Sequence, residues 1–191
     1  MRILGGIWAG KHLQSPVGRV RPTHEVVRDA WLAQLESDLK NARILDLFAG
    51  SGSLGLEALS RGAASADFVE NGGEALHALK ANVAQRKLRP APKGKRPTSR
   101  YKAARIFKQD AIPFAARLQA GSYDIAFVDP PYNSRKLDRI IQQWQHTPFS
   151  RILSVEHAPT HPVPEGQERI EFEVSFVTFY HAKVADIQIE P

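Results

Sequence analysis

Three glycines with a fixed spacing, Gly50, Gly52 and Gly55, follow a short apolar run and could let the backbone approach a ligand closely. Because the residues after them continue as a helix, the first N–H groups of that helix would point at the same ligand. Glu70 follows Gly50 by twenty positions, at the end of the next apolar run, and could accept hydrogen bonds from both hydroxyls of a ribose. A glycine turn alone needs no ligand, but with this acid it predicts a nucleoside-type ligand.

Asp46 discriminates between two such ligands, because it lies four residues before Gly50, at the end of the apolar run. A carboxylate there would repel the pyrophosphate of a dinucleotide and attract a cationic group such as an ammonium or a sulfonium. Opposite charges about 4 Å apart attract by about 4 kcal/mol at an effective dielectric constant of 20. The residue therefore favours S-adenosylmethionine over NAD, although an Asp46 that only capped the turn would suit both.

An Asp-Pro-Pro-Tyr element at residues 129–132 follows another apolar run, where open α/β sheets bind ligands. Two prolines fix the backbone and supply no N–H, so they aim the Asp129 carboxylate and the Pro130 carbonyl in fixed directions. Two converging acceptors can hold both N–H groups of a planar exocyclic amine and turn its lone pair toward an electrophilic methyl group. Tyr132 offers a face for an extruded base. A turn without function is the alternative, which the accompanying glycine turn disfavours.

These motifs need a sheet to position them, and the chain alternates apolar runs with helical patterns. Such alternation predicts an α/β fold with a mostly parallel sheet and helices on both faces. We expect the last two strands to be antiparallel. The predicted strands are residues 43–48, 64–70, 105–109, 123–128, 151–156, 169–174 and 176–184. The predicted helices are residues 24–39, 54–61, 73–85, 112–119 and 136–145.

Composition excludes several classes of protein. The 191 residues suit one compact domain with an ordinary core. The chain has no cysteine, which excludes disulfides, thiolate nucleophiles and cysteine-bound zinc. We expect neither a membrane span nor a signal peptide, and we predict a cytoplasmic protein. The seven histidines do not show the spacing of a metal site, so no metal is expected.

The net charge of +6 is unevenly distributed along the chain. The residues before Glu25 carry four basic and no acidic side chains, and residues 86–108 carry ten basic and no acidic ones. The remainder has twelve basic against twenty acidic residues. Such asymmetry favours a polyanionic partner, with solvated loops as the alternative.

The combination of motifs resembles class I S-adenosylmethionine-dependent amino-methyltransferases. More narrowly, it resembles the RsmD-type family, which methylates the N2 amine of a guanine in 16S ribosomal RNA. The resemblance implies a Rossmann-like, seven-stranded sheet with a reversed last strand and a short N-terminal extension. The segments that carry it are residues 2–10, 21–23, 27–28, 45–52, 54–63, 69–70, 82 and 127–132.

The resemblance also implies roles for individual residues. The methyl donor would be held by Asp46, Phe48, Gly50, Gly52, Gly55, Glu70 and Asp110, the last near the adenine. The target guanine would be held by Asp129, Pro130 and Tyr132. The RNA-facing residues would be Arg2, Trp8, Lys11, Arg21, Thr23 and Arg28.

The predicted organisation is an RNA-facing arm, residues 1–24, before a methyltransferase domain, residues 25–191, that contains a basic insertion at residues 86–104. The expected partner is ribosomal RNA or the assembling small subunit, and a monomer is favoured. Two other functions stay open. One is the same chemistry on adenine N6 of DNA or on a protein glutamine, which the basic arm disfavours. The other is a non-catalytic RNA-binding relative, which the intact acidic residues disfavour.

Overall fold

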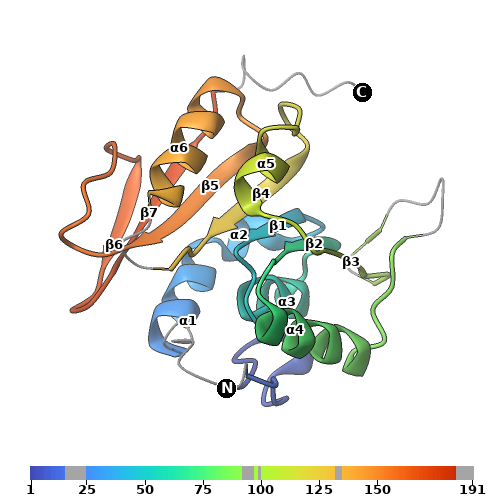
Figure 1. Ribbon diagram of the computed structural model, residues 1–191. Coiled ribbons are helices and arrows are strands. Elements are labelled where there is room, and N and C mark those ends of the chain that lie inside the picture. The colour runs from blue at the N-terminus through green and yellow to red at the C-terminus, as the bar shows by residue number, and fades with distance from the viewer. Residues whose placement is uncertain (16–24, 92–96, 99, 132–134, 184–191) are drawn as a thin grey trace.

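The computed structural model describes residues 1–15, 25–91, 97–98, 100–131 and 135–183 (Figure 1). The strands are β1 (Arg43–Leu47), β2 (Ser65–Val69), β3 (Ala103–Phe107), β4 (Tyr123–Val128), β5 (Ser150–His157), β6 (Glu168–Glu171) and β7 (Phe176–His181). The helices are the 3-10 turn η1 (Gly6–Trp8), α1 (Glu25–Gln34), α2 (Glu36–Leu39), α3 (Ser53–Arg61), α4 (Gly73–Gln85), α5 (Ala111–Ala115) and α6 (Lys136–His146).

One seven-stranded sheet has the order β3-β2-β1-β4-β5-β7-β6. The strands β1 to β5 are parallel where they pair, whereas β7 is antiparallel to both β5 and β6. The predicted mostly parallel sheet with a reversed last strand is therefore confirmed. Because the first five strands run the same way, the ends of β1, β2, β3 and β4 that carry the predicted site residues meet at one edge.

The sheet separates two apolar layers, and the alternation of side chains along each strand fixes which residue enters which layer. On β1, Ile44 packs with α1 to α4, whereas Leu45 and Leu47 pack with α5 and α6. Figure 1 shows the two groups of helices on opposite sides of the sheet. Asp46 therefore points toward the layer that contains α3.

Several predicted elements differ from the observed ones; the predicted strand over residues 169–174, for example, is β6 and ends at Glu171. The predicted helix over residues 24–39 is broken after Gln34, where the N–H of Asp38 bonds to Leu35 only three residues earlier and starts a new turn. Strand β3 begins two residues before its predicted start and ends before Asp110, which caps the next helix. That helix, α5, has five residues instead of eight.

The described part of the arm, residues 1–15, is a compact hairpin that lies against α3 and α4. Its backbone is closed by hydrogen bonds from Ile3 N to Lys11 O (2.9 Å) and from Leu13 N to Met1 O (3.0 Å). The side chains of Ile3 and Leu13 belong to the same core cluster as the neighbouring helices. Within the described ranges, no helix has the length and apolar character needed to cross a membrane.

Candidate active site

The glycine turn joins β1 to α3, and two of its glycines are required by local geometry. Gly52 has a φ of 82°, and a Cβ there would lie 2.6 Å from Cδ1 of Leu79. Gly50 also has a positive φ, 56°, but no heavy atom would lie within 4 Å of a Cβ at this position. The turn is thus packed tightly at Gly52 and open at Gly50, where a ligand could approach the backbone.

Replacing Gly55 with alanine is expected to lower the free energy of unfolding by about 1–3 kcal/mol, the usual cost of overpacking a core. A Cβ at Gly55 would press on the ring of Phe68 and lie 3.0 Å from Oδ2 of Asp46. Gly73→Ala is the matched control, because nothing surrounds that Cβ position and alanine favours helix. Urea unfolding of both variants measures the difference. Equal stability of the two variants would show that α3 yields to the extra methyl group.

Asp46 is a buried carboxyl group beside the first turn of α3. The residue is 2% exposed, and its Oδ2 accepts a hydrogen bond from the N–H of Gly55 (2.9 Å). Burial raises the pKa of Asp46 to about 7; the charge of Glu70 acts in the same direction and the Gly55 N–H opposes the shift. A cation beside this group would favour its ionised form.

Glu70 connects the glycine turn to the start of α4. Its Oε2 accepts from the N–H of Gly50 (2.8 Å), and its Oε1 accepts from the N–H groups of Asn71 (2.8 Å) and Gly72 (2.6 Å). The structure therefore places the predicted ribose-binding acid against Gly50, the open position of the turn. Gly50 and Glu70, which are twenty positions apart in the sequence, are therefore in direct contact.

Asp110 lies beside this pair, after β3. Its Oδ1 caps α5 by accepting from the N–H of Ile112 (2.9 Å), and its Oδ2 lies 3.4 Å from both Nδ2 of Asn71 and Nζ of Lys136. Asn71 thus bridges Glu70 and Asp110 through one backbone and one side-chain hydrogen bond. The ends of β1, β2 and β3 are joined by a continuous set of polar contacts.

The Asp-Pro-Pro-Tyr element begins next to the glycine turn. The register pairs Leu47 of β1 with Val128 of β4, so Phe48 and Asp129 are the residues that directly follow these two adjacent strands. Phe48 has a φ of 62°, which turns the chain toward the glycines, and Nζ of Lys136 lies 5.7 Å from its ring centre. Asp129 is partly exposed and Pro130 is buried. Tyr132 lies outside the described residues, as do Arg21 and Thr23.

The arm residues predicted to face RNA differ in their surroundings. Lys11 is exposed, Trp8 is partly exposed, and Arg2 is exposed but ion-paired with Glu25 (3.5 Å). The structure corrects the prediction for Arg28. Its side chain is fully buried, with Nε 3.6 Å from Oε2 of Glu57, so its guanidinium holds the interior together and reaches no surface.

Glu57 is a buried residue that holds the arm in place, and the motifs in the sequence did not single it out. This fully buried carboxylate accepts hydrogen bonds from the backbone N–H groups of Leu4 (2.9 Å) and Gly5 (2.7 Å) and from Nε of Arg61 (3.1 Å). Burial lowers the pKa of Arg28, and the charge of Glu57 opposes that shift. The available signal was an acid between Leu56 and Ala58, within the otherwise apolar residues 54–59.

Asn82 connects the arm to the glycine turn. Its Oδ1 accepts from the N–H of Gln14 (2.8 Å), while its Nδ2 donates to the carbonyl of Gln14 and to that of Ser51 (both 3.0 Å). The side chain is fully buried. One amide therefore ties the arm and the predicted donor-binding turn to α4.

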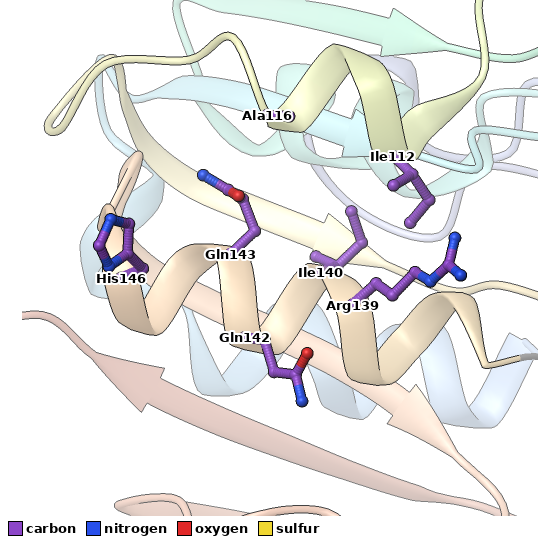
Figure 2. Close-up of a pocket in the computed structure, with 7 residues that line it drawn as sticks. All are labelled: Ile112, Ala116, Arg139, Ile140, Gln142, Gln143 and His146. Atoms are coloured by element: carbon purple, nitrogen blue, oxygen red, sulfur yellow. The ribbon is translucent and has the colours of Figure 1, made fainter.

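A hollow of about 310 Å³ lies elsewhere, between α5 and α6. Figure 2 shows that Ile112 and Ala116 line it from one side and that side chains of α6 line the other. The α6 residues are Arg139, Ile140, Gln142, Gln143 and His146. It contains none of the predicted site residues. Among the residues that the structure describes, no group of three or more His, Asp or Glu side chains could hold a metal ion.

Comparison with known proteins places the chain in a family. The family described as Conserved hypothetical protein 95 matches residues 1–171. The chain belongs to this family. Ribosomal RNA small subunit methyltransferase D of Escherichia coli is 36% identical over 142 residues, which are 74% of this chain and 65% of that protein. YlbH of Bacillus subtilis is 31% identical over 172 residues, 86% of each chain. The predicted resemblance to the RsmD-type family is thereby confirmed.

Solved structures of similar proteins confirm the fold. The yhhF protein of Escherichia coli is 30% identical with a TM-score of 0.76, and the comparison covers 95% of this chain and 97% of that one. A hypothetical protein of Thermus thermophilus has the same TM-score at 27% identity, over 95% and 99% of the two chains. A 16S rRNA N2 G1207 methyltransferase of Thermus thermophilus, 16% identical with a TM-score of 0.63 over 87% of this chain and 44% of its own, shares the class I methyltransferase fold.

Proposed function

We propose that this chain transfers a methyl group from S-adenosylmethionine to the N2 amine of a guanine in small-subunit ribosomal RNA. The observation that carries the proposal is the junction of β1 and β4. There the register brings Phe48, which leads into the glycine turn, beside Asp129, which opens the Asp-Pro-Pro-Tyr element. Membership of the family, and a relative named Ribosomal RNA small subunit methyltransferase D, support the RNA substrate.

The donor would lie along the polar contacts at the ends of β1 to β3. Glu70 would receive the ribose hydroxyls, Asp110 would lie near the adenine, and Asp46 would face a cationic group of the donor. A carboxylate has about four acceptor positions, and Glu70 already uses three for backbone N–H groups. Binding of two hydroxyls therefore requires that at least one of these backbone bonds be shared or released.

The target amine would be held by Asp129 and by the carbonyl of Pro130. Each accepts one N–H of the amine, which directs the nitrogen lone pair toward the methyl group. The new N–C bond forms as the donor's S–C bond breaks, and the methylated nitrogen then loses a proton, for which the Asp129 carboxylate is a suitable acceptor. Positioning and electrostatics supply most of the rate enhancement in this arrangement.

Methyl incorporation from labelled donor into small-subunit RNA, naked or in particles that lack the mark, tests the proposal. We expect Asp129→Ala to lower incorporation by at least about 100-fold, because both the amine contact and the proton acceptor are removed. Mapping the labelled nucleotide then identifies the base. Wild-type incorporation no higher than that of Asp129→Ala would contradict the proposal. Label found in DNA adenine or in a protein glutamine instead would show that the substrate is DNA or protein.

A further inference from the structure

The two basic segments of the chain, far apart in sequence, meet at Arg86. This residue follows α4 and begins the basic insertion, and its Nη2 donates to the backbone carbonyl of His12 in the arm (3.0 Å). Its Nη1 donates to the carbonyl of Asn82 (3.0 Å), and its guanidinium carbon lies 6.0 Å from the ring centre of Trp8. Arg86 therefore holds the arm and the start of the insertion side by side.

The charges around Arg86 are of one sign. Residues 75–109 contain no aspartate or glutamate. Lys87 and Arg89 follow Arg86 and are exposed, and Lys11 is exposed on the arm. The backbone of Arg89 is fixed because its carbonyl accepts from the N–H of Ala104 (3.0 Å). These side chains project from an ordered backbone, which lowers the entropy lost when they bind a partner.

Three other basic residues of these segments are already engaged in the fold. Lys102 donates to the carbonyl of Ala63 (3.1 Å), and burial lowers its pKa. Arg105 is paired with Asp67 of the adjacent strand. Arg2 of the arm is paired with Glu25. Lys11, Arg86, Lys87 and Arg89 therefore supply positive charge where the arm meets the start of the insertion, and the partly exposed indole of Trp8 lies against Arg86.

We propose that Trp8, Lys11, Arg86, Lys87 and Arg89 form one surface that binds the phosphate backbone of RNA away from the methylated base. The inference rests on the proposed function and adds a second region of substrate contact. Each phosphate neutralised by Lys or Arg releases bound counterions, so binding through this surface must weaken as salt rises. Lys11 from the arm and Lys87 and Arg89 from the insertion supply the contacts, and Arg86 positions them.

The test measures how the affinity for a fragment of 16S ribosomal RNA changes with salt concentration. We expect the slope of log K against log salt to fall by about 1.4–1.8 for Lys87→Gln/Arg89→Gln and by about 0.7–0.9 for Lys11→Gln. For the triple variant, which combines Lys11→Gln, Lys87→Gln and Arg89→Gln, the slope is expected to fall by the sum of these two decreases. The matched control is Arg117→Gln/Arg139→Gln, which removes two exposed charges near α5 and on α6, on the opposite layer, and should keep the wild-type slope.

Two results would overturn the inference. One is a slope for Lys87→Gln/Arg89→Gln equal to that of the control, which would make the insertion a solvated loop. The other is a decrease in slope for the triple variant no larger than that of Lys87→Gln/Arg89→Gln alone. Such a result would show that the arm and the insertion do not contact the same RNA. Methyl incorporation by the same preparations separates the two proposals. If either result is found and the wild-type protein still methylates RNA, the proposed function stands and only the proposed RNA-binding surface is contradicted.

Discussion

Replacing Glu57 with leucine is expected to destabilise the fold by about 3–5 kcal/mol, the usual cost of leaving one member of a buried ion pair without its partner. The guanidinium of Arg28 and the carboxylate of Glu57 are both fully buried. The N–H groups of Leu4 and Gly5 would lose their acceptor in the same variant. Urea unfolding followed by far-UV circular dichroism measures the loss.

Two further variants make this prediction specific. Glu36→Gln also removes a carboxylate charge that pairs with Arg61 (3.4 Å), but at an exposed side chain, and is expected to cost less than about 0.5 kcal/mol. Glu57→Leu combined with Arg28→Met removes both buried charges and should recover much of the lost stability. A Glu57→Leu protein with the wild-type unfolding midpoint would show that the arm is held by its apolar contacts alone.

Asp46→Asn is expected to stabilise the protein at pH 8 and to weaken donor binding strongly. The folded-state pKa of about 7 exceeds the ordinary value of 3.8, so ionising this buried group costs up to about 4 kcal/mol of stability. That cost is absent below pH about 4, grows as pH rises to about 7, and is complete above it. Asparagine avoids it. The same substitution removes an attraction for a cationic donor of about 4 kcal/mol, or roughly a thousandfold in affinity.

The pH dependence of donor affinity tests the same residue. A cationic donor binds the ionised form of Asp46 more tightly, so affinity should rise about tenfold per pH unit below pH 7 and level off above it. Calorimetry between pH 5.5 and 7.5 should show protons released on binding. Asp124→Asn, at the start of β4 and paired with Arg43, is the control and should leave this dependence intact. A flat profile in the wild-type protein would remove Asp46 from donor binding.

Much of the fold could be predicted because buried parallel strands are continuous apolar runs. Helix α4 has the predicted bounds, and β1 and β4 agree within one residue. The glycine turn and Glu70 could be predicted as partners because their spacing reflects one strand–helix–strand unit. The predicted start of strand β3 was two residues late, because Ala103 and Ala104 lie in the segment predicted as the basic insertion, where charged residues give no hydrophobic periodicity.

The surroundings of single charged residues could not be predicted in the same way. The resemblance to the RsmD-type family implied an RNA-facing role for Arg28, yet the residue is buried and its partner Glu57 lies on another helix. Neither the pairing nor the burial follows from local sequence, since both depend on how α1 packs against α3. Asn82 is similar, because its three hydrogen bonds join segments that only the folded chain brings together. Tyr132, Arg21 and Thr23 stay predictions.

The hydrogen bonds of the arm also determine when it can fold during synthesis of the protein. Leu4 and Gly5 are synthesised 53 and 52 positions before Glu57, and Gln14 precedes Asn82 by 68 positions. At about 5–20 residues per second, the arm spends several seconds outside the ribosome before its acceptors emerge. The arm can therefore be held in its folded position only after Glu57 and Asn82 have been synthesised.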